Sequence, residues 1–208
     1  MGFKQELGRR AQVLCVECFD MKMKAMSCIV VWAFVLLTHG VGFVPPVNAA
    51  EVQTLELASP PAAAERAYLG ITKDMFRLAD VQADIIIVEF FSLYCAMCAK
   101  EAPAVAELFF LAQKQSTSQS RIVLLGIGTG NSADEVVRFK KQHTVPFPLV
   151  PDQKVLVART LKMAITPGFI AFKKQPDGSL ISLHKRLGVL GPPQHFLDSV
   201  LKAAAVLP

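Results

Sequence analysis

The chain has 208 residues, 52% of them hydrophobic, and a formal net charge of +5. This length suits one domain with an N-terminal extension. The charge is mild and no dense basic cluster occurs, which is unlike a nucleic-acid-binding protein, so we expect no nucleic-acid partner.

The segment 21–49 is typical of a secretory signal. It begins with two lysines, continues with the apolar run 29–37 and ends in a motif that fits cleavage after Ala49. A membrane-spanning helix needs about 20 apolar residues, and polar residues and glycines interrupt this segment over 38–42. We therefore expect an exported, periplasmic protein that is soluble after cleavage near Ala49. A retained N-terminal membrane anchor is the alternative.

The expected domain organisation has four parts. Residues 1–20 precede two better start sites, Met21 and Met23, and we interpret them as a mis-assigned or extended N-terminus. The parts that follow are the signal or anchor over 21–49, a lead-in over 50–69 and one folded domain over 70–208.

Hydrophobic periodicity and turn residues predict the secondary structure of the folded part. In chain order the elements are a candidate strand within 51–57, a helix over 62–69, an edge segment over 76–78, a buried strand over 84–91, a helix from 94 or 95 to 115, a buried strand over 121–128, a helix over 133–143, an extended piece over 147–150, a short helix over 154–162, a strand over 168–173, a hairpin turn over 176–179, its partner strand over 180–187 and a final helix from 192 to 205. Ser132 and Glu135 are expected to form a capping box, and Pro103 to kink its helix.

This order of elements predicts an α/β domain. Helices connect the first strands, which should therefore be parallel, and the hairpin should add an antiparallel pair. We expect a mixed central sheet flanked by helices, built as βαβ plus a C-terminal ββα.

Cys95 and Cys98 lie where the strand over 84–91 passes into the next helix. The positive end of a helix dipole stabilises a thiolate, and the thiolate is the form that attacks disulfides. The other three cysteines lie in 1–20 or in the leader, so an exported domain would retain only this pair, which argues against a disulfide scaffold. A zinc site would need two further ligands at suitable spacing, so we expect no metal.

The segment 88–103, VEFFSLYCAMCAKEAP, resembles the active-site region of the thioredoxin superfamily. Within that superfamily the chain is most similar to the TlpA-like exported thiol–disulfide oxidoreductases, over roughly 70–203. The resemblance implies a thioredoxin-like fold and disulfide exchange with protein substrates without a cofactor. It implies that Cys95 attacks, that Cys98 resolves and that the two form a redox disulfide, with reduction as the favoured direction. It also implies an upstream electron donor, for which a membrane protein is one candidate.

The resemblance also implies functional roles for two acidic residues. Glu89 lies inside an apolar strand, where burial of a carboxylate is costly and raises its pKa. Thioredoxins carry an acid at the matching position, which implies a proton relay for Cys98. Glu101 lies one helical turn after Cys98, where TlpA-like proteins often have a glutamate that influences the thiols. The alternatives are an ion-paired or solvent-reaching Glu89 and a solvated helix charge at Glu101.

Three residues are expected to contact the substrate. Thr166-Pro167 matches the cis-proline loop of the superfamily, where the backbone of Thr166 would pair with a substrate strand beside Cys95; an ordinary trans turn is the alternative. Tyr94 stands where a tryptophan usually precedes the first cysteine and keeps an aromatic wall. The dipeptide Ala96-Met97 is neutral and leaves the direction of electron flow open.

Two other functions fit parts of the pattern. Ser92 precedes Cys95 by three residues, as the threonine of a thiol peroxidase would, but Val88 replaces the proline expected four residues earlier. A non-enzymatic module that binds Cu(I) through both thiols and a histidine is the second alternative, because soft thiolates suit that ion.

Overall fold

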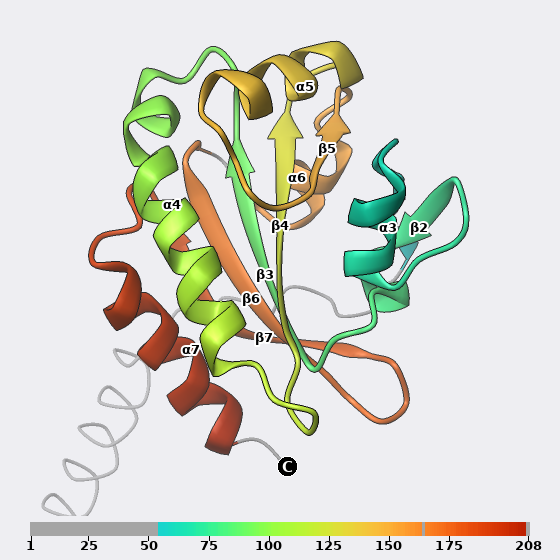
Figure 1. Ribbon diagram of the computed structural model, residues 1–208, viewed down its shortest axis with the longest axis vertical. Helices are drawn as coiled ribbons and strands as arrows, with labels where there is room; N and C mark the ends of the chain where they lie inside the picture. The colour runs from blue at the N-terminus through green and yellow to red at the C-terminus, as the bar shows by residue number, and fades with distance from the viewer. Residues whose placement is uncertain (1–53, 164, 207–208) are drawn as a thin grey trace, which may run out of the picture. The chain divides into compact units, whose positions relative to one another are not determined.

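Figure 1 shows a computed structural model of the chain, in which helices pack against a central sheet. The structure describes residues 54–163 and 165–206. The expected signal or anchor over 21–49 and the N-terminal part over 1–20 lie outside the described residues. Among the described residues, no helix is long and apolar enough to cross a membrane.

The secondary structure follows the expected order, with an additional 3-10 helix after β2. The strands are β1 (Glu56–Ala58), β2 (Met75–Arg77), β3 (Ile85–Phe91), β4 (Ile122–Thr129), β5 (Leu149–Asp152), β6 (Gly168–Lys174) and β7 (Leu180–Leu187). The helices are α3 (Ala63–Leu69), the 3-10 helix η1 (Leu78–Asp80), α4 (Ala96–Gln115), α5 (Ala133–Gln142), α6 (Leu156–Thr160) and α7 (Pro193–Val206). The capping box of Ser132 and Glu135 at the start of α5 is confirmed.

Five strands form the central sheet in the order β5-β4-β3-β6-β7. β4 is parallel to both β3 and β5, whereas β6 is antiparallel to both β3 and β7. The predicted α/β class with a mixed central sheet is therefore confirmed. β3 lies in the middle of the sheet and every residue in it is buried, as expected for a continuous apolar strand covered on both faces.

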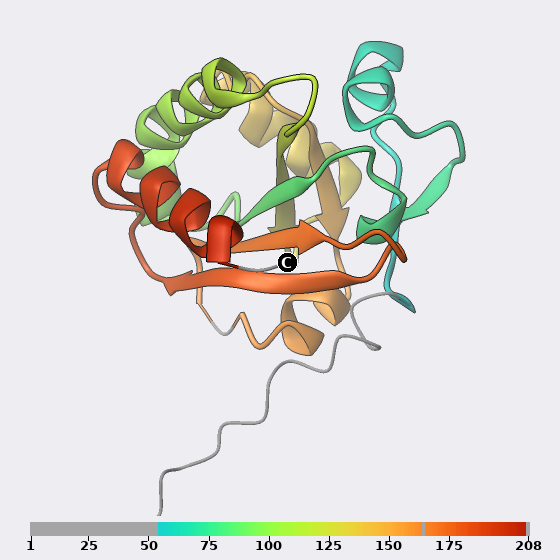
Figure 2. The ribbon, with the colours of Figure 1, turned by 90° about the horizontal axis from the view of Figure 1, so that it is seen from below.

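Side-chain alternation along β3 separates two hydrophobic clusters. Val88 and Phe90 pack with α6 and the N-terminal elements, whereas Ile87 and Phe91 pack with α4, α5 and α7. Figure 2 shows α4 and α7 on one side of the sheet and α6 on the other. Glu89 has the parity of Ile87 and Phe91, so its side chain faces the layer that contains α4.

Helix α3 covers the edge of β4 where β5 does not reach. β5 pairs with β4 only from Gly126 onward, which leaves the amide of Leu124 without a strand partner on that side. The hydroxyl of Tyr68 in α3 accepts a hydrogen bond from that amide at 2.9 Å. The guanidinium of Arg121 donates to the backbone carbonyl of Tyr68. These contacts join the N-terminal elements to the central sheet.

The structure corrects the extended piece expected over 147–150. β5 runs instead over Leu149–Asp152 and includes Pro151. Proline has no N–H to donate to a strand ladder. A strand that starts after Pro148 therefore has one missing hydrogen bond fewer in its ladder. Pro151 is tolerated because β5 is an edge strand of the sheet.

The helix expected over 154–162 is also shorter than predicted. α6 covers only Leu156–Thr160, because Val155 and Lys162 on either side have left-handed backbones with φ of 57° and 54°. The carboxylate of Asp152 accepts hydrogen bonds from the amides of Leu156 and Ala158 at 2.8 and 2.9 Å. This carboxylate caps the start of the short helix.

Candidate active site

The two cysteines lie at the junction of β3 and α4. Cys95 is the N-cap of α4, and its Sγ accepts a hydrogen bond from the amide of Cys98 at 3.1 Å. The two residues form a disulfide, with their Cα atoms 5.2 Å apart. Cys95 is half-buried and Cys98 is fully buried. This arrangement leaves Cys95 as the sulfur that a second molecule reaches first.

The loop before β6 faces Cys95. The Sγ of Cys95 lies 3.3 Å from the carbonyl oxygen of Thr166, and the Thr166–Pro167 peptide bond is cis. The carbonyl of Pro167 accepts a hydrogen bond from the amide of Gly188 at 2.9 Å. The structure therefore brings Thr166 and Pro167 beside the cysteine pair, as expected from the sequence.

Glu89 lies in the same layer as the buried cysteine. Its side chain is 2% exposed and faces the cluster that contains Cys98. Burial, together with a smaller contribution from the negative charge of Glu101, raises the pKa of Glu89 to about 8. Among the described residues no lysine, arginine or histidine forms an ion pair with Glu89. The group is therefore a carboxyl that holds its proton at neutral pH.

Glu101 contacts a different part of the molecule from the one expected. Its Oε2 accepts a hydrogen bond from the amide of Leu190 at 2.8 Å. Leu190 lies in the turn between β7 and α7, and the same turn contains Gly188, the partner of Pro167. Glu101 thus connects α4 to the turn that supports the cis-proline loop, and its charge also acts on Glu89.

Tyr94 is exposed beside the cysteines, with 74% of its surface accessible. Its hydroxyl donates a hydrogen bond to the carboxylate of Glu135 in α5. Four further apolar residues have accessible surface, one between the two cysteines and three next to Thr166 or Gly188: Met97, Ile165, Leu187 and Val189. Together with Tyr94 they form an apolar rim in the segments that contain Cys95, Thr166 and Gly188.

Sequence reasoning missed Asn131 as a residue of the site. Its side chain is fully buried, and its Oδ1 accepts a hydrogen bond from the amide of Leu93 at 2.9 Å. Its Nδ2 has no hydrogen-bond partner. A signal was available, because Asn131 follows β4, and the carboxyl ends of parallel neighbours β3 and β4 meet at one edge of the sheet.

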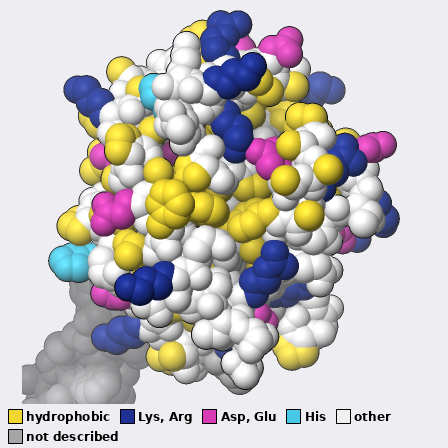
Figure 3. All heavy atoms as spheres, viewed as in Figure 1, with side chains coloured by type: hydrophobic (Ala, Val, Ile, Leu, Met, Phe, Trp, Pro, Cys, Tyr) yellow, Lys and Arg dark blue, Asp and Glu magenta, His cyan; other side chains and the backbone are white. Residues whose placement is uncertain are grey.

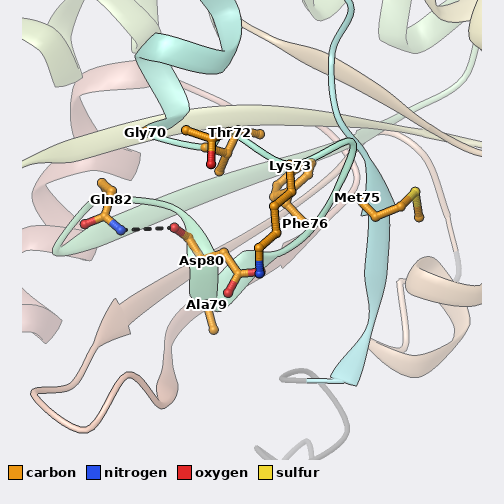
Figure 4. A pocket seen from close by; sticks show the side chains of 9 residues that line it. Gly70, Thr72, Lys73, Met75, Phe76, Ala79, Asp80 and Gln82 are labelled. Carbon is orange, nitrogen blue, oxygen red and sulfur yellow. Dashed lines mark hydrogen bonds between the residues drawn. The ribbon is translucent and has the colours of Figure 1, made fainter.

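The surface has two further features, a pocket and an apolar area. A pocket of about 270 Å³ lies between α3 and β2, lined by residues such as Thr72, Lys73 and Asp80 (Figure 4). Its lining ends at Gln82, before β3 begins, and seven strand residues at about 3.3 Å each separate it from Cys95. On the face in Figure 3, hydrophobic side chains gather near the centre, with charged side chains of both signs around them.

Among residues 54–163 and 165–206, no group of three or more His, Cys, Asp or Glu side chains is arranged to hold a metal ion.

Known proteins are similar to this chain in sequence family and in fold. The family model described as AhpC/TSA matches residues 62–185. No curated protein matches the chain. A solved structure of MTB DsbF in mixed oxidised and reduced forms is 14% identical, with a TM-score of 0.53, over 74% of this chain and 97% of that one. A secreted Mycobacterium tuberculosis disulfide oxidoreductase homologous to E. coli DsbE is also 14% identical, with a TM-score of 0.50, over 76% and 98%. At this identity the two structures establish a shared fold.

Proposed function

The chain belongs to the AhpC/TSA family within the thioredoxin superfamily, and we propose that it is an exported oxidoreductase that reduces disulfides of protein substrates through Cys95 and Cys98. One observation carries the proposal. A half-exposed sulfur sits at a helix N-cap, is joined to a buried partner sulfur and lies 3.3 Å from the backbone carbonyl oxygen of Thr166. These are the parts that thiol–disulfide exchange requires.

The proposed reaction has two exchange steps. The Cys95 thiolate attacks one sulfur of a substrate disulfide, forming a mixed disulfide and releasing the other substrate sulfur as a thiolate that takes up a proton. The thiol of Cys98 then loses its proton and attacks the Cys95 sulfur. This second step forms the Cys95–Cys98 disulfide and releases the second substrate thiol. The substrate gains two electrons and two protons, and an upstream dithiol donor must return them to the protein.

Glu89 is the proposed acceptor of the Cys98 proton in its ionised form, which a pKa of about 8 leaves to a minority of molecules at neutral pH. A pKa of about 8 lies close to the ordinary pKa of a thiol, about 8.5, which favours transfer in both directions. Both groups are buried, and the Glu89 side chain faces the cluster that contains Cys98. Glu101 tunes this acceptor in the proposal, because its negative charge disfavours ionisation of Glu89.

The substrate site is proposed to be the rim around Cys95. The Thr166 carbonyl, which faces Cys95, is proposed to accept a hydrogen bond from an extended substrate backbone. Tyr94, which directly precedes Cys95, offers an exposed aromatic ring to the same substrate. An unfolded or flexible polypeptide with apolar residues around its cysteine would fit this rim.

Export is a separate part of the proposal. It rests on the signal-like segment 21–49, with cleavage near Ala49 or retention as an anchor. The solved structure described as secreted supports it by analogy of fold. In this arrangement 50–69 is a lead-in, 70–208 is the oxidoreductase domain, and the electron donor is a membrane-bound or exported dithiol protein.

Reduction of insulin disulfides by the full chain tests the function. We expect Cys95→Ser to abolish turnover and Cys98→Ser to accumulate a mixed disulfide that thiol reductants release. A protein with neither activity nor a trapped partner would contradict the proposal. Peroxide consumption that survives Cys98→Ser would favour a thiol peroxidase instead, and stoichiometric Cu(I) binding without disulfide exchange would favour a copper-binding module.

Equilibration with glutathione tests the direction. A reductase should have a Cys95–Cys98 potential near that of thioredoxin, about −270 mV, whereas a potential near that of DsbA, about −120 mV, would reverse the assigned direction.

A further inference from the structure

We propose that Asn131 and Glu135 are positioning residues that hold the two residues before Cys95 and thereby set the place of its sulfur. The inference rests on the proposed function, because it concerns the reactivity of the same cysteine. Both residues belong to one short stretch, the turn after β4 and the first turn of α5. They act on consecutive residues, Leu93 and Tyr94.

The first contact fixes the backbone. β3 ends at Phe91, so the amide of Leu93 has no strand partner, and the Oδ1 of Asn131 accepts its hydrogen bond across 38 positions of sequence. The amide of Asn131 is itself bound to the carbonyl of Gly128 at 3.1 Å, which ties the asparagine to the end of β4. Leu93 is therefore anchored to the central sheet through one side chain.

Burial of the side-chain amide of Asn131 costs stability, which indicates that Asn131 serves to position Leu93 rather than to stabilise the fold. Its Nδ2 is buried without a partner, and an unpaired buried donor costs about 1–3 kcal/mol. That cost offsets much of the stability that the Oδ1 hydrogen bond contributes. The main consequence of Asn131 is then the geometry of Leu93 rather than the free energy of unfolding.

The second contact fixes a side chain. The Oε2 of Glu135 accepts from the amide of Ser132 at 2.8 Å and so caps α5, while the other carboxylate oxygen accepts from the hydroxyl of Tyr94. The hydrogen bond to Glu135, and after it the charge of that residue, raises the pKa of Tyr94, and the same hydrogen bond lowers the pKa of Glu135, as expected for a phenol that donates to a carboxylate. An exposed ring that would otherwise rotate is thus held to α5.

Together the two contacts limit the motion of Cys95. The amide of Cys95 is bound to the carbonyl of Ser92 at 3.1 Å, so the turn 92–95 moves as a unit with Leu93 and Tyr94. Its sulfur faces Thr166 from the other side. Because misplacement of a reacting atom by about 1 Å can cost about 100-fold in rate, loosening this turn should slow attack by Cys95 without removing any reacting group.

The test measures the reaction of the reduced full chain with a small neutral disulfide, 2,2′-dipyridyl disulfide, as a function of pH. The plateau rate at high pH reports the position of the Cys95 thiolate, and the midpoint reports its pKa. We expect Asn131→Ala to lower the plateau rate by about tenfold. Asn131→Asp, which retains an acceptor oxygen, should restore most of the plateau rate while raising the midpoint through its charge.

The Tyr94 contact is tested with protein substrate. Glu135→Ala and Tyr94→Phe should each raise the KM for insulin by a similar factor of about three to ten, and the double variant should do no more than Glu135→Ala alone. Ser132→Ala is the matched control. It removes the 3.4 Å hydrogen bond that the amide of Glu135 donates to the Oγ of Ser132, and it leaves the Leu93 and Tyr94 contacts in place. It should leave KM and the plateau rate unchanged.

The outcomes separate this inference from the function. An Asn131→Ala variant with an intact disulfide and a wild-type plateau rate would overturn the role of Asn131, and additive effects of Tyr94→Phe and Glu135→Ala would overturn that of Glu135. If insulin is not reduced by the wild type, the proposed function fails, while the rate with the small disulfide still reports whether Asn131 positions Cys95.

Discussion

The sulfur of Cys95 lies 3.3 Å from the carbonyl oxygen of Thr166, although 71 positions of sequence separate them. The sheet explains the proximity. β3 and β6 are antiparallel neighbours, with Phe90 opposite Gly168, so the end of one strand meets the start of the other. The segment before β6 is therefore placed beside the segment after β3.

The buried acid Glu89 should make stability depend on pH. Its folded-state pKa of about 8 lies above its ordinary value of 4.5, so the folded protein binds more protons than the unfolded chain between these values. Stability from this group is fully present below about pH 4.5 and is lost as pH rises toward 8, by at most about 1.4 kcal/mol per pH unit.

Glu89→Gln should remove that dependence, because glutamine does not titrate. Chemical denaturation of the oxidised proteins at pH 5 and pH 8 measures the difference. The wild type should lose stability relative to the variant across this interval. Equal losses in both proteins would show that Glu89 ionises as easily in the folded state as in the unfolded one.

The charge of Glu101 should raise the pKa of Glu89 from a distance. Glu101→Gln removes the charge and retains an oxygen that can accept from the Leu190 amide, so the titration of Glu89 should move to lower pH with little change in stability. Carboxyl NMR on labelled glutamate follows this titration. Glu107→Gln, on an exposed position of the same helix, is the control and should leave the titration in place.

A methyl group at Gly168 should disturb the cis-proline loop. A Cβ there would lie 2.8 Å from Cε of Met163 and 3.0 Å from the carbonyl oxygen of Ile165. The methionine end can move, but the carbonyl can move only with the loop that carries Thr166. Gly168→Ala should therefore lower insulin-reduction activity by about tenfold and destabilise the fold by about 1–3 kcal/mol.

Gly126→Ala is the matched control for that substitution. Its Cβ would meet only side-chain atoms, the nearest being Cδ2 of Leu149 at 2.2 Å. It should lower the free energy of unfolding by a comparable amount and leave the activity of the folded protein close to wild type. A similar loss of activity in both variants would assign the effect to general destabilisation.

The hydroxyl of Tyr68 should stabilise the junction between α3 and β4. Tyr68→Phe would leave the amide of Leu124 without its 2.9 Å partner and should cost about 1–3 kcal/mol in denaturant titrations. Gln113→Ala removes the 3.3 Å hydrogen bond from Gln113 to the same hydroxyl and keeps the Leu124 contact, so its effect should stay within about 0.5 kcal/mol. Equal costs would contradict the assignment.

Local sequence patterns predicted most of the helices and strands, because these elements form through interactions between residues that are close in the sequence. The apolar run of β3, the Ser132–Glu135 capping box and the 180–187 strand each depend on residues close in sequence, and each is found where expected. The errors fell at β5 and α6, where pairing with β4 and the carboxylate of Asp152 decide the boundaries. The register of β5 depends on a strand outside the local sequence, whereas Asp152 caps α6 from four residues away, a local contact that the residue pattern did not reveal.

The sequence by itself determined that a CxxC pair follows a buried strand and begins a helix, that an acid interrupts that strand and that a Thr-Pro pair precedes another. Only the tertiary structure decided that Glu101 reaches the Leu190 amide and that Asn131 holds Leu93. The physical reason is that each contact joins a side chain to a loop amide 38 or 89 positions away in the chain, and only the packing of helices and sheet brings the two together. Periodicity in the sequence indicates on which face of a helix or strand a side chain lies, whereas the tertiary structure decides which residues that face contacts.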